Sequence, residues 1–284
     1  MAESTQTLQG LLESAGQLLA AAGVPESRRE AIRLWSDLGR LPVATTVLAR
    51  GESVAEELAV AYLAAVGQRA AGVPLAYVTG WSGFRRLILS TDKRALIPRP
   101  ETEGLVEVAL ARVRGGIAAD IGTGSGAIAL ALADEGAFEQ VLAVDLSEEA
   151  LALARSNGAR LGLTVEWLAG DLVTPLEGRR VDLLISNPPY LMEAEYAALD
   201  ASVRDYEPLL ALPSGVDGLT ATRRLLVEGR AVMASDGWIA LEVDCRRAAA
   251  TAALAEGFGW RDITVLDDLF GRARYVLARQ GLNQ

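Results

Sequence analysis

Short apolar runs alternate with helical runs through the second part of this 284-residue chain. The segments expected as strands are 116–121, 141–144, 165–168, 181–186 and 238–243, and the runs 127–133 and 148–161 between them have helical spacing. Strands that alternate with helices predict a parallel sheet with helices on both faces. Because ligands of such sheets bind at the carboxyl ends of the strands, the turns after the strands are the candidate site.

Three further segments surround this α/β pattern. The first eighty residues predict a small helical bundle, with capping-box patterns at Ser27–Glu30 and Ser53–Glu56. Apolar residues and glycines between 77 and 93 predict a short hairpin, and residues 263–266 and 274–278 predict a closing hairpin around Gly271. We therefore expect a helical domain at 1–75, a hairpin linker at 76–95 and an α/β domain at 96–284.

The turn after the first strand reads Asp120-Ile-Gly-Thr-Gly-Ser-Gly126. Glycines let a backbone turn tightly from strand to helix and leave no side chain between the loop and a ligand. Asp145 follows Gly122 by 23 residues, at the end of the next strand, where a carboxylate can accept hydrogen bonds from both hydroxyls of a ribose. The pattern predicts a nucleoside site.

Two nucleoside ligands fit this pattern. The glycines also match the dinucleotide fingerprint G-x-G-x-x-A, from Gly122 to Ala127, so a nicotinamide dinucleotide is an alternative. We favour S-adenosylmethionine for two reasons: Asp120 and Asp171 around the pocket would repel a pyrophosphate, and the turn Ser186–Tyr190 supplies an acceptor for an NH₂ group. A third interpretation is that the glycines only allow the helix to pack closely on the strand.

The strand at 181–186 leads into Ser186-Asn-Pro-Pro-Tyr190. Two prolines fix two φ angles and remove two N–H donors, so this turn offers mainly carbonyl acceptors. Asn187 adds a side-chain oxygen, and Tyr190 adds a flat face for stacking. The motif predicts a planar NH₂ group as guest, either the exocyclic amino group of a base or the amide of a glutamine. A proline-rich turn without a binding role is the alternative.

Composition narrows the chemistry further. The chain has no histidine and one cysteine, which excludes imidazole bases, Ser–His and Cys–His pairs and most zinc sites, so we expect no metal. The net charge of −10 disfavours nucleic acid as the main partner. The single cysteine, and the lack of a signal segment or membrane-length apolar run, favour a cytoplasmic protein without membrane contact. We expect a monomer.

Five motifs occur in the order and spacing found in bacterial peptide-chain release factor N5-glutamine methyltransferases, which this chain resembles from about Pro74 to its C-terminus. They are Leu96-Ile-Pro-Arg-Pro-Glu-Thr-Glu103, the Asp120–Leu130 loop, Ser186–Tyr190, Tyr206-Glu-Pro208 and Asp217-Gly-Leu219. The resemblance implies a class I S-adenosylmethionine-dependent methyltransferase fold, which is Rossmann-like, with a mostly parallel sheet and a C-terminal antiparallel hairpin. It also implies S-adenosylmethionine as cofactor and, as substrate, the glutamine of the Gly-Gly-Gln motif in release factors.

The residues carried over by position fall into two groups. The cofactor-binding group is Asp120, Gly122, Thr123, Gly124, Ser125, Gly126, Asp145, Asp171, Leu172 and Asn187, with Leu172 near the adenine. The catalytic group is Asn187, Pro188, Pro189 and Tyr190, which would hold the glutamine. The chain departs from the family at Asp244, where a glycine is expected, and at Leu209 and Leu210, which replace a more polar pair. These departures concern the rim of the site and the docking of the partner.

The expected protein is thus an enzyme of translation termination, with a helical domain that docks the substrate and a catalytic methyltransferase domain. The rival enzyme is an N6-adenine methyltransferase on DNA or RNA, which would hold a flipped base in the same pocket. Such an enzyme needs a basic reading domain, whereas residues 1–80 hold six arginines against eight acidic residues. A non-catalytic adaptor with a vestigial nucleoside pocket is the third alternative.

Overall fold

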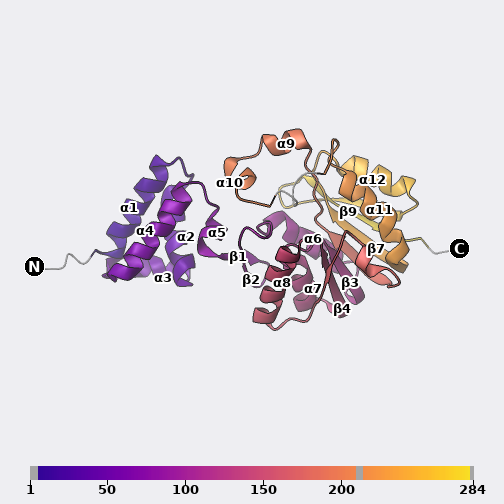
Figure 1. The fold of residues 1–284 in the computed structure, drawn as a ribbon, viewed down its shortest axis with the longest axis horizontal. Coiled ribbons are helices and arrows are strands. Elements are labelled where there is room, and N and C mark those ends of the chain that lie inside the picture. The colour runs from indigo at the N-terminus through magenta and orange to yellow at the C-terminus, as the bar shows by residue number, and fades with distance from the viewer. Residues whose placement is uncertain (1–5, 209–213, 282–284) are drawn as a thin grey trace, which may run out of the picture. The chain divides into compact units, whose positions relative to one another are not determined.

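The computed structural model describes residues 6–208 and 214–281 and divides the chain into two compact units (Figure 1). The first unit is Met1–Trp81 with Ala201–Tyr206, and the second is Ser82–Asp200 with Glu207–Gln284. The α/β motifs thus fall in the second unit, and most of the helical N-terminal region falls in the first.

The first unit is a helical bundle. Its elements are α1 (Leu8–Ala21), α2 (Ser27–Gly39), α3 (Val43–Leu48), η1 (Ala49–Gly51), α4 (Glu56–Ala70), α5 (Leu75–Thr79) and α10 (Ala201–Arg204). Tyr62 lies in its core, where the hydroxyl donates to the Ala31 carbonyl at 2.8 Å and the ring meets Trp35 edge-on. Across the described residues, no helix is long and apolar enough to cross a membrane.

Both capping boxes that the sequence predicted in this bundle were wrong. Helix α2 begins at Ser27 itself, after Glu26, and α4 begins after Ala55. Ser53 instead pairs with Thr7 in an isolated β-bridge, so its backbone is held by the segment before α1. The side-chain cap in this region is on α1, where Thr7 accepts a hydrogen bond from the Gly10 N–H.

The second unit is built on a seven-stranded sheet in the order β5-β4-β3-β6-β7-β9-β8. Strands β5, β4, β3, β6 and β7 are parallel, and β9 is antiparallel to both β7 and β8. The strands are β3 (Gly115–Ile121), β4 (Ala137–Asp145), β5 (Glu166–Ala169), β6 (Val181–Ser186), β7 (Met233–Glu242), β8 (Arg261–Asp267) and β9 (Ala273–Arg279). The predicted parallel sheet with an antiparallel closing hairpin is confirmed.

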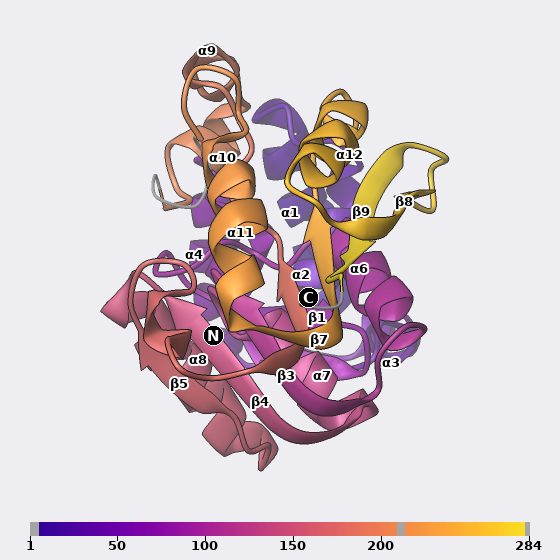
Figure 2. The same cartoon turned by 90° about the vertical axis from the view of Figure 1, so that its right-hand side faces the viewer.

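Helices cover both faces of this sheet because successive strand residues point to opposite sides. Ala118, Leu183 and their neighbours pack with α6 (Pro100–Leu110) and α7 (Ala127–Glu135). On the opposite face, Ala119, Leu184 and the buried residues near them pack with α11 (Thr220–Val232) and α12 (Ala248–Gly257), which are drawn in orange to gold in Figure 2. Helix α8 (Glu148–Leu161) packs beside β4 and β5, and the short elements are η2 (Thr174–Leu176) and α9 (Glu193–Ala197).

Strands β4 and β7 begin earlier than the sequence predicted. Residues 137–140 alternate between exposed and half-buried, and the apolar run that signals the strand starts only at Val141. Likewise, β7 begins at Met233 and passes through an exposed pair before the apolar run at Trp238. These first residues belong to the strands through backbone pairing, which leaves no hydrophobic pattern in the sequence.

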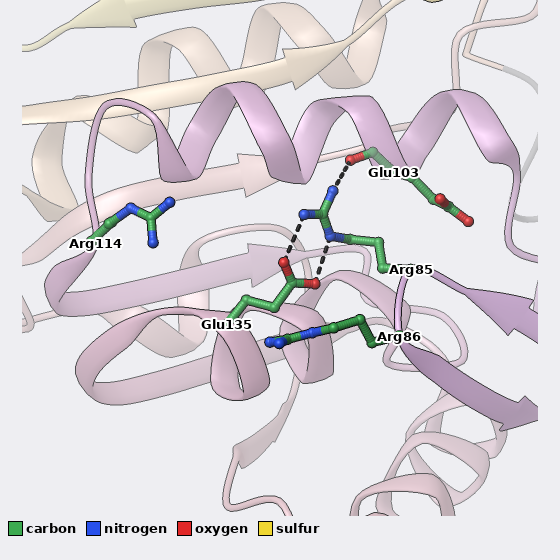
Figure 3. Close-up of a pocket in the computed structure, with 5 residues that line it drawn as sticks. All are labelled: Arg85, Arg86, Glu103, Arg114 and Glu135. Atoms are coloured by element: carbon green, nitrogen blue, oxygen red, sulfur yellow. Dashed lines mark hydrogen bonds and ion pairs between the residues drawn. The ribbon is translucent and has the colours of Figure 1, made fainter.

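A two-stranded sheet, β1 (Trp81–Phe84) and β2 (Leu87–Ser90), precedes the main sheet. Between its strands, Arg85 makes a two-pronged ion pair with Glu135 of α7, with both contacts at 2.6 Å, and its Nη1 donates to the Glu103 carbonyl (Figure 3). Arg85, Arg86, Glu103, Arg114 and Glu135 line a cavity of about 390 Å³. Because Arg85 is already paired, we assign it the structural role of fastening this turn to α6 and α7.

Candidate active site

A cavity of about 380 Å³ lies at the carboxyl edge of the parallel strands, in the second unit. The predicted site residues on its wall are Gly122, Gly124, Asp145, Asp171, Leu172, Asn187 and Pro189. Other wall residues come from the segment 94–96, from Pro208 and from the start of α11. The turns after four neighbouring strands therefore meet at one place, as the parallel order requires.

The three glycines of the loop after β3 have different structural roles. All have positive φ, with +73° at Gly122, +56° at Gly124 and +84° at Gly126, a region that disfavours side chains. Gly122 and Gly124 line the cavity. A Cβ on Gly126 would instead lie 3.1–3.2 Å from Ala154, Leu130 and Trp167, so this glycine allows close packing behind the loop. The packing interpretation of the motif thus applies to one glycine of the three.

Asp145 is held in place by the backbone around it. Its Oδ2 accepts from the Gly124 N–H at 2.8 Å, and its Oδ1 accepts from the Ser147 N–H at 2.9 Å. Burial raises the pKa of this carboxyl, although the same backbone hydrogen bonds lower it. The carboxylate is half-buried, lies on the cavity wall and keeps lone pairs for a ligand that offers hydroxyls.

Asp120 lies behind the cavity wall and does not face the ligand space. Its side chain is fully buried, and Oδ2 accepts from the Thr123 hydroxyl at 2.6 Å and from the Ala129 N–H at 3.1 Å. Thr123 and Ser125 are also buried. Burial, chiefly, raises the pKa of Asp120 to about 7. These residues hold the shape of the glycine loop from behind.

Asp171 faces the cavity, but it is paired with a cation. Its Oδ2 lies 2.9 Å from Nη1 of Arg224, which is on the same wall. Since Asp120 is behind the wall and Asp171 is paired, the electrostatic argument against a pyrophosphate was wrong. Next to it, Leu172 has a φ of +48°, an unfavourable value for a residue with a Cβ, and its side chain forms part of the cavity wall.

The Ser186–Tyr190 turn is held in place by the side chains of its first two residues. The Ser186 hydroxyl donates to the Ile121 carbonyl at 2.6 Å, which joins this turn to the end of β3. The side-chain nitrogen of Asn187 donates to the Thr102 hydroxyl oxygen at 3.1 Å, so the amide oxygen is the group left for the cavity. Pro189 is on the wall and Pro188 is buried. Tyr190 is half-buried, and burial chiefly raises its pKa to about 12.

Comparison with known proteins gives the family. The PrmC N-terminal domain family matches residues 10–80, and the methyltransferase small domain family matches residues 101–205. The release factor glutamine methyltransferase of Deinococcus radiodurans is 41% identical over 279 residues, which cover 96% of this chain and 98% of that protein. The chain belongs to the release factor glutamine methyltransferase family. The enzyme of that name from Bacillus subtilis is 34% identical over 283 residues, with 96% and 98% covered.

Solved structures support the fold of this family member. A methyltransferase from Pyrococcus furiosus matches with a TM-score of 0.53 and 18% identity, over 68% of this chain and 89% of that one. The T. thermophilus 16S rRNA N2 G1207 methyltransferase, solved with AdoMet and guanosine, matches with a TM-score of 0.51 and 17% identity, over 70% of this chain and 49% of that one. At these identities the likeness concerns the fold alone, and it confirms the class I methyltransferase architecture.

This member of the release factor glutamine methyltransferase family has site residues that the sequence reasoning did not single out. Thr102 contacts Asn187 directly, because its hydroxyl oxygen accepts the hydrogen bond from the Asn187 amide nitrogen at 3.1 Å. Arg99 forms a 2.6 Å ion pair with Glu207, whose side chain is 1% exposed. The available signal was their place in the motifs Leu96–Glu103 and Tyr206–Pro208, which carried the resemblance.

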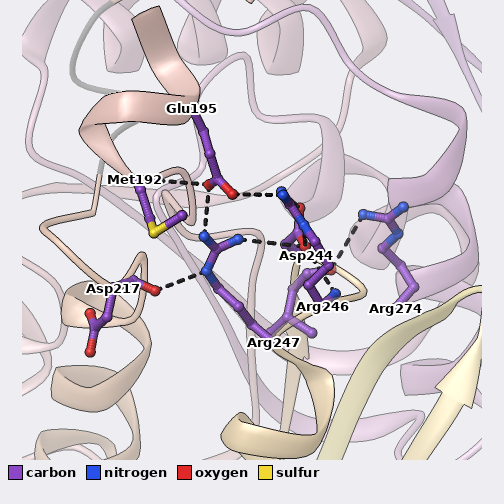
Figure 4. Close-up of polar contacts among 8 residues, drawn as sticks. Met192, Glu195, Asp217, Asp244, Arg246, Arg247 and Arg274 are labelled. Atoms are coloured by element: carbon purple, nitrogen blue, oxygen red, sulfur yellow. Dashed lines mark hydrogen bonds and ion pairs between the residues drawn. The ribbon is translucent and has the colours of Figure 1, made fainter. Parts of the chain in front are cut away.

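Asp244, where the resemblance led us to expect a glycine, belongs to a charged network (Figure 4). Asp244 accepts from Arg246, and Arg247 bonds both Glu195 of α9 and the Asp217 carbonyl, at 2.7 and 2.9 Å. Arg246 chiefly lowers the pKa of Asp244 through their hydrogen bond. Asp244 therefore helps to tie α9 to the turn before α12. Leu209 and Leu210, where the resemblance led us to expect a more polar pair, lie outside the described residues.

Proposed function

We propose that this chain transfers a methyl group from S-adenosylmethionine to the side-chain amide nitrogen of a glutamine in a peptide-chain release factor. The observation that carries this proposal is the direction of the Asn187 amide, which gives its nitrogen to Thr102 and leaves its oxygen to accept from a guest NH₂. Family membership supports a release factor as substrate. The target within it, on this proposal, is the glutamine of the Gly-Gly-Gln motif.

The cavity suits S-adenosylmethionine in size and in the placing of its polar groups. A volume of about 380 Å³ falls within the usual range for small-molecule sites, about 300–1,000 Å³. We assign Asp145 to the ribose hydroxyls, Gly122 and Gly124 to close backbone contact, and Leu172 to the adenine. Asp171 completes this wall with Arg224, while Asp120, Thr123, Ser125 and Gly126 support the loop from behind. The antiparallel β9 supports this ligand over a dinucleotide, whose domains have six parallel strands.

The proposed mechanism relies on positioning. S-adenosylmethionine supplies a methyl group already activated by a positively charged sulfur. A neutral amide nitrogen is a poor nucleophile, because resonance draws its lone pair into the carbonyl. The Asn187 oxygen and the Pro188 carbonyl accept hydrogen bonds from the two N–H groups of the amide and stabilise the positive charge that develops on nitrogen as the nitrogen–methyl bond forms and the sulfur–methyl bond breaks. The methylated nitrogen then loses one proton to solvent, and the neutral thioether leaves. Pro189 and Tyr190 hold the flat amide group between them. This arrangement requires no histidine base.

The domain roles belong to the same proposal. We assign release-factor docking to residues 1–75, a linker to 76–95 and catalysis to 96–284, in a cytoplasmic monomer. The separate compact unit and the match at residues 10–80 support a distinct module. Removing residues 1–75 should raise KM for the release factor far more than it raises Kd for S-adenosylmethionine. An equal rise in both would remove the docking role.

The rival function uses the same acceptors on another NH₂ group. An adenine amino group, flipped out of DNA or RNA, is planar and offers two protons to the same site. The net charge of −10 disfavours this substrate, because nucleic acids are normally bound by basic surfaces.

One labelling experiment separates the two functions. The enzyme is given S-adenosylmethionine labelled in its methyl group, together with release factor, release factor with Gln→Ala in Gly-Gly-Gln, duplex DNA or ribosomal RNA. We expect label in the intact release factor alone, and far less in free glutamine, which lacks remote contacts. Labelled nucleic acid with an unlabelled release factor would overturn the proposal in favour of the adenine rival.

A further inference from the structure

We propose that Arg224 is a specificity-determining residue, which neutralises Asp171 on the cavity wall and so limits the preference of the site for its cationic donor over the neutral product. This inference rests on the placing of S-adenosylmethionine in the cavity, which is part of the function proposed above. It does not depend on which molecule accepts the methyl group.

Arg224 is held between two carboxylates. It lies in the second turn of α11 and forms part of the cavity wall, as does Asp171, which follows β5. Its Nη1 donates to Oδ2 of Asp171 at 2.9 Å. Its Nε and Nη2 donate to the two carboxylate oxygens of Glu228, at 2.7 and 3.2 Å. Glu228 is not among the described residues of the wall, so this two-pronged pair fixes the guanidinium on α11 and leaves Nη1 for Asp171.

The charges on the cavity wall differ in how they are compensated. Arg94 donates to both oxygens of Asp92, at 2.6 and 2.8 Å. Asp171 is paired with Arg224. Asp145 accepts from two backbone N–H groups and forms no ion pair within the described part of the chain. Asp145 therefore gives the cavity a net negative charge, and the loss of Arg224 would add a second one.

The donor and the product differ in the charge to which this wall responds. S-adenosylmethionine has a sulfonium and is one unit more positive than S-adenosylhomocysteine, the thioether that remains when the sulfur–methyl bond breaks and its electron pair stays on sulfur. An uncompensated Asp171 would therefore attract the donor more than the product. Attraction to the donor in its ground state does not speed methyl transfer, because only interactions that strengthen in the transition state do so. Arg224 keeps this unproductive attraction small.

Solvent exposure sets the size of the effect. The side chains of Arg224 and Asp171 are 41% and 51% exposed, so water and salt screen their charges. Two unit charges about 8 Å apart, at an effective dielectric constant of about 40 to 80, change an affinity by about two- to fivefold. We therefore expect an effect of this size, which is smaller than that of a lost direct contact to the ligand.

The test measures the ratio of two Kd values, product over donor, by calorimetry. Damage to packing affects both ligands alike and cancels in this ratio, because they share every group except the methyl and its charge. At about 0.02 M salt, Arg224→Met should raise the ratio about two- to fivefold, chiefly through tighter donor binding. Arg224→Lys keeps the charge and should stay within about 1.5-fold of the wild type.

Arg223→Met is the matched control. Arg223 precedes Arg224 on α11, is also 41% exposed and pairs with Asp217 at 2.9 Å, but it is not among the described residues of the wall. Its loss should change the ratio by at most about 1.5-fold. The double variant Arg224→Met/Asp171→Asn removes both charges and should restore the wild-type ratio. Raising the salt to about 0.5 M should remove most of the effect of Arg224→Met.

Asp171→Asn tests the same balance with the opposite sign, and it serves if Arg224→Met does not fold. It leaves the Arg224 charge uncompensated, so the ratio should fall by a similar factor. An unchanged ratio in folded Arg224→Met or Asp171→Asn, or an equal change in Arg223→Met, would overturn the proposal. An error in the placing of the cofactor gives a different result, because Asp145→Ala would then also leave donor affinity at the wild-type value.

Discussion

The Gly124 N–H donates a 2.8 Å hydrogen bond to Oδ2 of Asp145. This bond joins the turn after β3 to the end of β4, and both residues line the same cavity. The loop and the carboxylate therefore hold each other in position before any ligand arrives. Preorganisation of this kind reduces the ordering cost of binding.

Asp145→Ala should weaken S-adenosylmethionine binding by about 1.5 to 3 kcal/mol, or roughly 10- to 150-fold in Kd, because a charged acceptor leaves the ribose hydroxyls. Asp145→Asn keeps one acceptor oxygen, so its Kd for S-adenosylmethionine should lie between those of the wild type and Asp145→Ala. Isothermal titration calorimetry measures both. Wild-type affinity in a folded alanine variant would mean that the ribose binds elsewhere.

Asn187→Ala should lower kcat by about 10²- to 10³-fold, the usual cost of losing one preformed transition-state hydrogen bond, while affinity for S-adenosylmethionine stays nearly intact. Asn187→Asp should lose less, since a carboxylate still accepts. Single-turnover methylation of the release factor gives the rates, and calorimetry gives Kd. Normal turnover in Asn187→Ala would mean that the Ser186–Tyr190 motif is an ordinary turn without a catalytic role.

Gly126→Ala and Gly122→Ala form a matched pair, because both place a Cβ on a backbone with positive φ. Gly126→Ala should cost more stability, about 2 to 4 kcal/mol, since its Cβ also crowds Ala154 and Trp167, whereas a Cβ on Gly122 meets nothing within 4 Å. Gly122→Ala should chiefly lower cofactor affinity. Urea unfolding and calorimetry check the pair, and equal losses of stability would contradict this division of roles.

Asp120 should make stability depend on pH. Its pKa is about 7 in the folded protein, against about 3.9 for an unfolded aspartate, so between these values the folded state holds a proton that the unfolded state has lost. Stability therefore falls as pH rises through this window, by up to about 1.4 kcal/mol per unit, and levels off above it. Urea unfolding of the wild type and Asp120→Asn from pH 5 to 8 isolates the effect. Parallel pH curves would refute it.

Arg99→Ala should destabilise the protein by about 1 to 3 kcal/mol, because it leaves the buried Glu207 carboxylate without its cation; one third of the Arg99 side chain is exposed, which moderates the loss. Kd for S-adenosylmethionine should also rise, since Pro208 lies on the cavity wall. Adding Glu207→Gln should recover part of the stability. A double variant less stable than Arg99→Ala would contradict this account.

The sequence alone predicted the features that depend on neighbours along the chain. Alternating strands and helices implied the parallel sheet, and its right-handed connections bring the turns after the strands to one edge. The same local reasoning failed where a distant partner intervened. Ser53 fits a capping pattern, but pairing with Thr7 places it outside the helix.

The tertiary structure decided which end of each polar side chain faces the ligand. The sequence offered Asn187 as an acceptor, but the direction of its amide depends on Thr102, which is 85 residues away along the chain. The sequence assigned Asp120 and Asp171 the same place beside the ligand. In the structure, Asp120 supports the loop from behind and Asp171 is paired with Arg224. The physical reason is that burial and hydrogen-bond direction depend on which groups the fold brings together from distant positions, whereas strand and turn patterns depend on adjacent residues.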